Sequence, residues 1–86
     1  MAISYYERLR LAARELFGED ADFEFCRTSQ RKQYHVIKSG ETTLANVRLK
    51  DIPVGKRIIF TFEAAAEAVG NIDLSTIRTV LKKHGI

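Results

Sequence analysis

The sequence predicts a small α+β domain with an N-terminal helix, an antiparallel sheet of three or four strands and a C-terminal helix-turn-helix. Three observations support this fold class. Apolar residues recur at helical spacing in 4–17 and from 61 to the end of the chain, they alternate with polar residues between 22 and 50, and turn residues separate these segments. The length of 86 residues fits one domain, 1–86, which the pattern divides into helix plus sheet (1–60) and helix-turn-helix (61–86).

The first helix is expected over residues 4–17. Ser4 and Glu7 have the spacing of a capping box, in which the serine hydroxyl accepts from the third helical amide and the glutamate reaches back. The apolar positions that follow recur every three or four residues: Leu9, Ala12, Ala13, Leu16 and Phe17. Gly18 is suited to ending the helix in the left-handed conformation.

Three strands are expected in 22–27, 33–38 and 43–50, because polar and apolar residues alternate there between turn signals. The stretch from Lys56 to Thr61 is the candidate for a fourth strand, after the loop that holds the only proline. A sheet with the first helix on one face is expected to bury Phe23, Phe25, Tyr34, Val36 and Val47.

The last segment has the residues that a helix-turn-helix needs. Thr61 is expected to cap an alanine-rich helix that Gly70 ends, and Asp73 is a good N-cap for the final helix. Ala66 in the alanine-rich helix is small enough to let the final helix approach closely. Ile77 in the final helix is expected to pack back on the alanine-rich helix. The apolar face of the final helix is Leu74, Ile77, Val80 and Leu81.

The solvent side of the final helix carries the candidate DNA-binding residues. Arg78 suits bidentate recognition of guanine, lysines suit phosphate, and hydroxyls and amides at a helix N-terminus bind phosphate. The expected contacts are Ser75, Thr76, Arg78, Thr79, Lys82 and Lys83. A secondary nucleic-acid surface is expected at Arg31, Lys32, Lys56 and Arg57.

Composition sets bounds on the partner and the chemistry. A net charge of +3 with a pI near 9.2 permits nucleic-acid binding, and the bases are segregated from the acids along the chain. The single cysteine allows no internal disulfide, and the sequence shows neither a signal peptide nor a membrane span, so a cytoplasmic protein without a membrane partner is expected. No spacing of His and Cys predicts a metal site, and we expect no cofactor and no catalytic residue. A homodimer would help to stabilise so small a domain.

The segment Ala65-Ala66-x-Ala68-Val69-Gly70, followed by Ile72-Asp73-Leu74-Ser75-Thr76-Ile77, resembles the helix-turn-helix of Fis-type regulators. It also resembles the helix-turn-helix modules that accompany homing endonucleases, in which a strand and a Ser or Thr cap precede the alanine-rich helix. The resemblance covers the last 26–30 residues and departs at Asn71, an extra residue in the turn. It implies DNA binding through the final helix, with DNA favoured over RNA.

The expected function is therefore that of a small DNA-binding regulator or accessory factor, of a kind common in phages, plasmids and other mobile elements. Two alternatives remain open. The tail from Asp73 to Ile86 also resembles HicA-type toxins, which implies a ribonuclease with a double-stranded-RNA-binding-like α-β-β-β-α fold and a strand histidine, here His35, although the Gly-Ser-His approach to that histidine is missing. The other alternative is a non-enzymatic protein-interaction or inhibitor domain.

Overall fold

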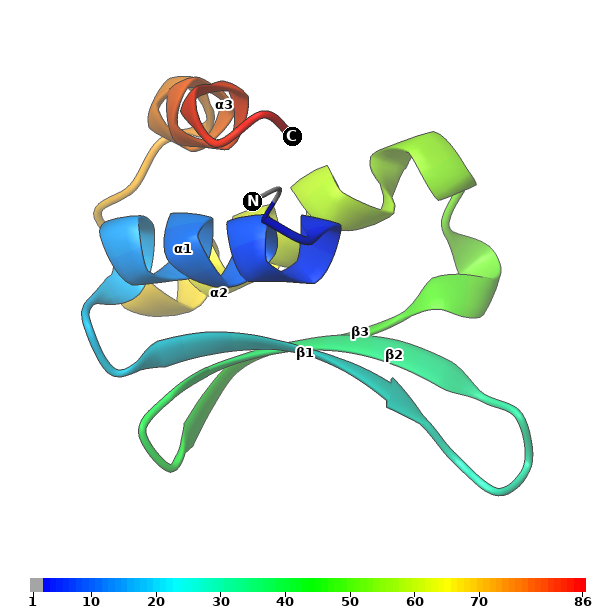
Figure 1. Ribbon diagram of the computed structural model, residues 1–86. Coiled ribbons are helices and arrows are strands. Elements are labelled where there is room, and N and C mark those ends of the chain that lie inside the picture. The colour runs from blue at the N-terminus through cyan, green and yellow to red at the C-terminus, as the bar shows by residue number, and fades with distance from the viewer. Residues whose placement is uncertain (1–2) are drawn as a thin grey trace.

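The computed structural model describes residues 3–86 and confirms an α+β fold in the order α-β-β-β-α-α. The main elements are α1 (Tyr5–Phe17), β1 (Ala21–Arg27), β2 (Gln33–Ser39), β3 (Thr42–Arg48), α2 (Arg57–Val69) and α3 (Leu74–Lys83). Two short 3-10 turns, η1 (Leu49–Asp51) and η2 (Val54–Lys56), connect β3 to α2. In Figure 1, α1 and α2 lie on one face of a curved sheet, and α3 lies on their outer side as a third layer.

Helix α1 begins as the sequence predicts. Ser4 is its N-cap, and its hydroxyl accepts from the Glu7 amide at 3.2 Å. Leu9, Ala12 and Ala13 are fully buried on the side that faces the sheet and α2. One detail of the prediction is wrong: Gly18 has φ +110° and ψ 165°, which is not the left-handed helical conformation, although its amide still donates to the Arg14 carbonyl at 3.0 Å.

The sheet is antiparallel in the order β1-β2-β3. Its register pairs Phe23 with Ile37 and Phe25 with His35, so these four side chains share the face that the helices cover. The predicted buried set is therefore partly wrong. Tyr34 and Val36 lie on the opposite face from Phe23, and Phe25 is 38% exposed near the edge of the helix layer. Val36 is nevertheless buried, and Val47 is half-buried.

The predicted fourth strand at 56–61 is wrong, because these residues are helical. Helix α2 begins at Arg57, so Thr61 is an interior residue of this helix and not its cap. Its side chain is fully buried, and the hydroxyl donates to the Arg57 carbonyl at 2.7 Å. The reason is burial: Phe62, Ala65 and Ala66 continue a helical apolar stripe that starts at Ile58, and packing this stripe on the sheet outweighs local strand preference.

Aromatic stacking joins the sheet to both inner helices. The Phe62 ring of α2 stacks on Phe23 of β1 and on Phe17 of α1, with ring centroids 6.0 Å apart in each case. Helix α3 is fixed to this core by Ile77, Val80 and Leu81, which are all buried, while Leu74 is 39% exposed and contributes less than the sequence predicts. No helix within residues 3–86 is long and apolar enough to cross a membrane.

Candidate nucleic-acid interface

Helix α3 turns its predicted DNA-binding residues to solvent. All six are exposed: Ser75, Thr76, Arg78, Thr79, Lys82 and Lys83. The turn before the helix uses Gly70, whose φ of +98° ends α2 in the left-handed region, and Asn71 is accommodated in the short connection to Asp73. Helix α3 is thus packed on its apolar side and exposed to solvent on its polar side.

The N-terminus of α3 is already occupied by a carboxylate. Asp73 Oδ1 accepts from the Thr76 amide at 2.8 Å, and this hydrogen bond lowers the pKa of Asp73. The Thr79 hydroxyl is also committed, because it donates to the Ser75 carbonyl at 2.9 Å. A phosphate at this helix end would have to compete with a negative charge, so we expect the side chains further along α3 to make the useful contacts.

Lys83 belongs to an intramolecular ion pair. Its Nζ lies 3.0 Å from Glu15 Oε1 on α1, and His84 Nε2 lies 3.1 Å from the same oxygen. Both hydrogen bonds lower the pKa of Glu15, and the bond from Lys83 has the larger effect. Arg78 and Lys82 take part in none of the ion pairs formed among residues 3–86, so they are the cations of α3 best placed to meet an external anion.

A shallow groove between α2 and α3 brings a second cation beside Arg78. Lys56, at the end of η2, lines this groove together with Arg78. Its other lining residues are Ile59, Phe60 and Glu63. Lys56, which the sequence placed in the secondary surface, is therefore next to the predicted recognition helix, although the glutamate reduces the positive potential there.

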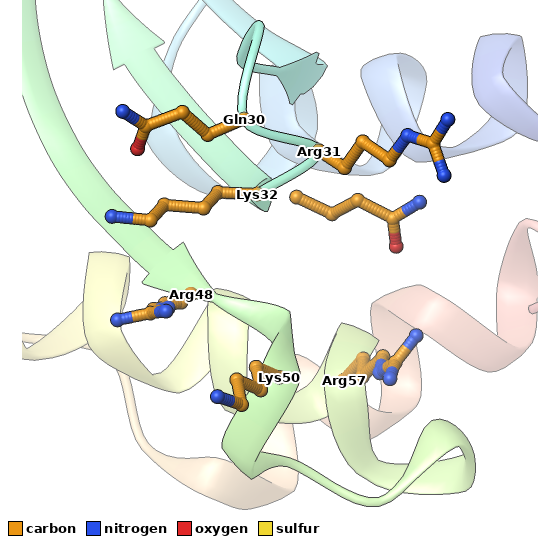
Figure 2. Close-up of a pocket in the computed structure, with 7 residues that line it drawn as sticks. Gln30, Arg31, Lys32, Arg48, Lys50 and Arg57 are labelled. Carbon is orange, nitrogen blue, oxygen red and sulfur yellow. The ribbon is translucent and has the colours of Figure 1, made fainter.

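The strongest concentration of positive charge lies elsewhere, at the end of the sheet (Figure 2). A hollow of about 360 Å³ is lined by Gln30, Arg31, Lys32, Gln33, Arg48, Lys50 and Arg57, which we call the basic hollow. Five of these residues are bases, two are amides, and none is acidic. They come from three segments that are distant in the sequence: the β1–β2 turn with the first residue of β2, the end of β3 with η1, and the start of α2.

The β1–β2 turn holds two of these bases by backbone hydrogen bonds. Thr28 exchanges hydrogen bonds with the other end of the turn: its amide donates to the Lys32 carbonyl at 2.9 Å, and its hydroxyl accepts from the Lys32 amide at 3.1 Å. Arg31 has φ +62°, the only positive φ at a non-glycine residue among those described. An arginine in this glycine-favouring conformation is an outlier of the kind that occurs at functional sites.

The other bases are positioned by strand pairing and by one side-chain hydrogen bond. Arg48 is the register partner of Tyr34, which places the end of β3 beside the β1–β2 turn. The Arg57 side chain is held in position by a hydrogen bond from its Nε to the Ile52 carbonyl, at 3.1 Å. No ion pair within residues 3–86 involves any of the five bases of the hollow. Unneutralised like charges around one concavity attract an anion and repel one another when it is empty.

The secondary surface expected from the sequence is thus divided. Arg31, Lys32 and Arg57 meet in the basic hollow, whereas Lys56 joins Arg78 in the α2–α3 groove. The sequence reasoning missed Arg48 and Lys50. The signal that could have found them is strand order, because an antiparallel β2–β3 pair brings the end of β3 to the start of β2.

His35 lies on β2 beneath the helices and is 6% exposed. Its ring packs against Phe23 and Phe25, with centroids 5.0 and 5.8 Å away, and Nδ1 lies 3.5 Å from the Thr61 hydroxyl. Burial, and then the charge of Arg57, lower the pKa of His35. Among residues 3–86, no cluster of three His, Cys, Asp or Glu side chains is placed to hold a metal ion.

Comparisons of this chain with protein-family models, with curated proteins and with solved structures give no match. The assignment of function therefore depends on the geometry and the charge described above.

Proposed function

We propose that this protein binds DNA, as a small regulator or accessory factor, by gripping the phosphate backbone in the basic hollow and presenting α3 to the major groove. The observation that carries the proposal is the hollow itself, which five bases from three segments line without an acid, with Lys32, Arg48 and Lys50 pointing to one side and Arg31 and Arg57 to the other (Figure 2). A polyanion is the partner that such a surface fits, and phosphate contacts supply most of the affinity of non-specific DNA binding.

The hollow and the α2–α3 groove are neighbours, which supports a single DNA ligand for both. Consecutive residues line the two depressions, with Lys56 in the groove and Arg57 in the hollow. Arg78 and Lys82 on α3 extend the positive surface beyond the groove, and both are exposed. In this proposal the hollow positions the duplex through its phosphates, while Arg78 reads a guanine edge and Lys82 contacts the backbone.

The direct test is a gel-shift titration of the full chain with random duplex DNA and with duplex RNA of equal length, at two salt concentrations. We expect a DNA complex that weakens steeply as salt rises. The Lys32→Gln/Arg48→Gln double variant should lose most of this binding. The matched control is Arg14→Gln, an exposed arginine in the last turn of α1. This end of α1 lies over the opposite end of the sheet from the β1–β2 turn (Figure 1). Equal losses for both variants, or retention of RNA alone, would contradict the proposal.

A ribonuclease is the second candidate, because His35 lies on β2, the middle strand of the sheet, and the order α-β-β-β-α precedes the last helix, α3. The surroundings of this histidine give little support to a catalytic role. Its side chain is 6% exposed, and its Nδ1 lies 3.5 Å from the Thr61 hydroxyl, so the ring has little access to an RNA phosphate. A ribonuclease toxin predicts growth arrest on expression that His35→Ala abolishes, and harmless expression of the unmodified chain would remove this candidate.

A further inference from the structure

A cluster of exposed aromatic side chains lies beside Arg57, the arginine that also lines the basic hollow. Tyr5, Tyr6 and Phe25 are 48%, 43% and 38% exposed, which is unusual for three large rings in so small a domain. They line a depression that we call the aromatic pocket, whose lining residues are Tyr5, Tyr6, Phe25, His35, Leu49, Val54, Arg57 and Ile58.

The aromatic rings contact one another in tilted and edge-to-face pairs. Tyr6 lies over Phe25 with centroids 6.1 Å apart and planes inclined by 51°, and Tyr5 meets Tyr6 edge to face at 6.1 Å. Phe25 is supported from below by His35, in an edge contact at 5.8 Å. The rings are therefore held by their neighbours, yet all three residues remain partly exposed to solvent.

The aromatic pocket and the basic hollow share a wall. Arg57 lines both, and its guanidinium is held by the Ile52 carbonyl. In η1 the neighbouring residues Leu49 and Lys50 face the two depressions separately, the leucine lining the aromatic pocket and the lysine lining the hollow. An anion held in the hollow and a flat apolar group held in the pocket would thus lie on either side of one arginine.

This juxtaposition matches a nucleotide, in which a sugar links a charged phosphate to a planar base. We propose that the aromatic pocket takes an unpaired base of the DNA whose phosphates lie in the basic hollow. The inference rests on the proposed function and makes it more specific. Bases inside a duplex are stacked on one another, so their faces can reach the pocket only where the DNA is single-stranded or where a base is turned out. The protein should therefore prefer DNA that carries a single-stranded segment next to a duplex.

The test compares three DNAs of one sequence: a blunt duplex, the same duplex with a short single-stranded overhang, and that duplex with an overhang of equal length lacking its bases. We expect the intact overhang to tighten binding by about tenfold, as base–aromatic stacking does elsewhere, and the abasic overhang to lose this gain. The Tyr6→Leu and Tyr5→Leu variants should bind the intact overhang only as well as the blunt duplex. Tyr34→Leu, on the opposite face of the sheet from Phe25, should retain the preference.

A spectroscopic readout shows contact directly and does not depend on affinity. The chain has three tyrosines and no tryptophan, so stacking of a base on Tyr5 or Tyr6 should quench the tyrosine emission on addition of the intact overhang. Equal affinity for the intact and abasic overhangs, or quenching that survives replacement of Tyr5 and Tyr6, would overturn the inference while leaving phosphate binding in place. Failure of all three DNAs to bind would overturn the proposed function as well.

Discussion

If the protein binds DNA as we propose, removing cations from the basic hollow should reduce the salt dependence of that binding by a fixed amount for each cation. Each phosphate that the protein neutralises contributes about −0.9 to the slope of log K against log salt concentration for duplex DNA. Five bases line the hollow. If each meets one phosphate, the hollow contributes a slope of 5 × −0.9, or about −4.5. Between about 50 and 200 mM salt this slope corresponds to a loss of roughly 500-fold in affinity.

The assay is a fluorescence-anisotropy titration of duplex DNA across this salt range. Lys32→Gln and Arg48→Gln should each reduce the steepness of the slope by about 0.9, and the double variant by about 1.8. Arg14→Gln removes the same charge from an exposed position on α1 and should leave the slope unchanged. A uniform effect of all three substitutions would refute the reasoning, because it would show that net charge matters and that the position of the charge does not.

Three further predictions concern stability and the cost of the site. Arg31→Gly relieves the left-handed backbone at φ +62° and should stabilise the fold by roughly 0.5–1 kcal/mol in chemical unfolding, while it weakens DNA binding. Leu81→Ala removes a buried anchor of α3 and should cost about 2–5 kcal/mol, whereas Leu74→Ala, at a 39% exposed position, should cost clearly less. Because the pKa of His35 is lowered in the folded protein, the unfolded chain binds more protons in mild acid. The contribution of His35 to stability is therefore complete above the ordinary histidine pKa of about 6.5 and is lost as pH falls below it, and His35→Gln should flatten this part of the profile.

Local signals in the sequence predicted most of the elements. The capping position of Ser4, the alternation in the three strands and the N-cap Asp73 are each encoded within a few residues, and the structure has all of them. The same holds for the outward face of α3, because helical spacing separates Ile77, Val80 and Leu81 from Arg78 and Lys82.

The predictions failed where the answer depends on tertiary packing. The run from Lys56 to Thr61 contains two isoleucines and a phenylalanine, a composition that also suits a strand. It is helical because Ile58 and Phe62 pack together on the core. The choice of buried sheet face failed for a related reason. Both faces of β2 carry apolar residues, and the pairing of Phe23 with Ile37 decides which of them lies under the helices.

The residues of the basic hollow also could not be predicted from local sequence signals. Arg48 and Lys50 are separated from Lys32 by most of the β2–β3 hairpin, and strand pairing alone unites them. Gathering five bases without an acid costs the empty fold some self-repulsion, which a domain of 86 residues can ill tolerate. A neutral ligand, or a protein partner with few acids, would not offset this repulsion. This repulsion is the physical reason for our proposal that the hollow holds a chain of closely spaced negative charges. In that proposal Arg57, which lines both the hollow and the aromatic pocket, lies between the bound phosphates and the bound base.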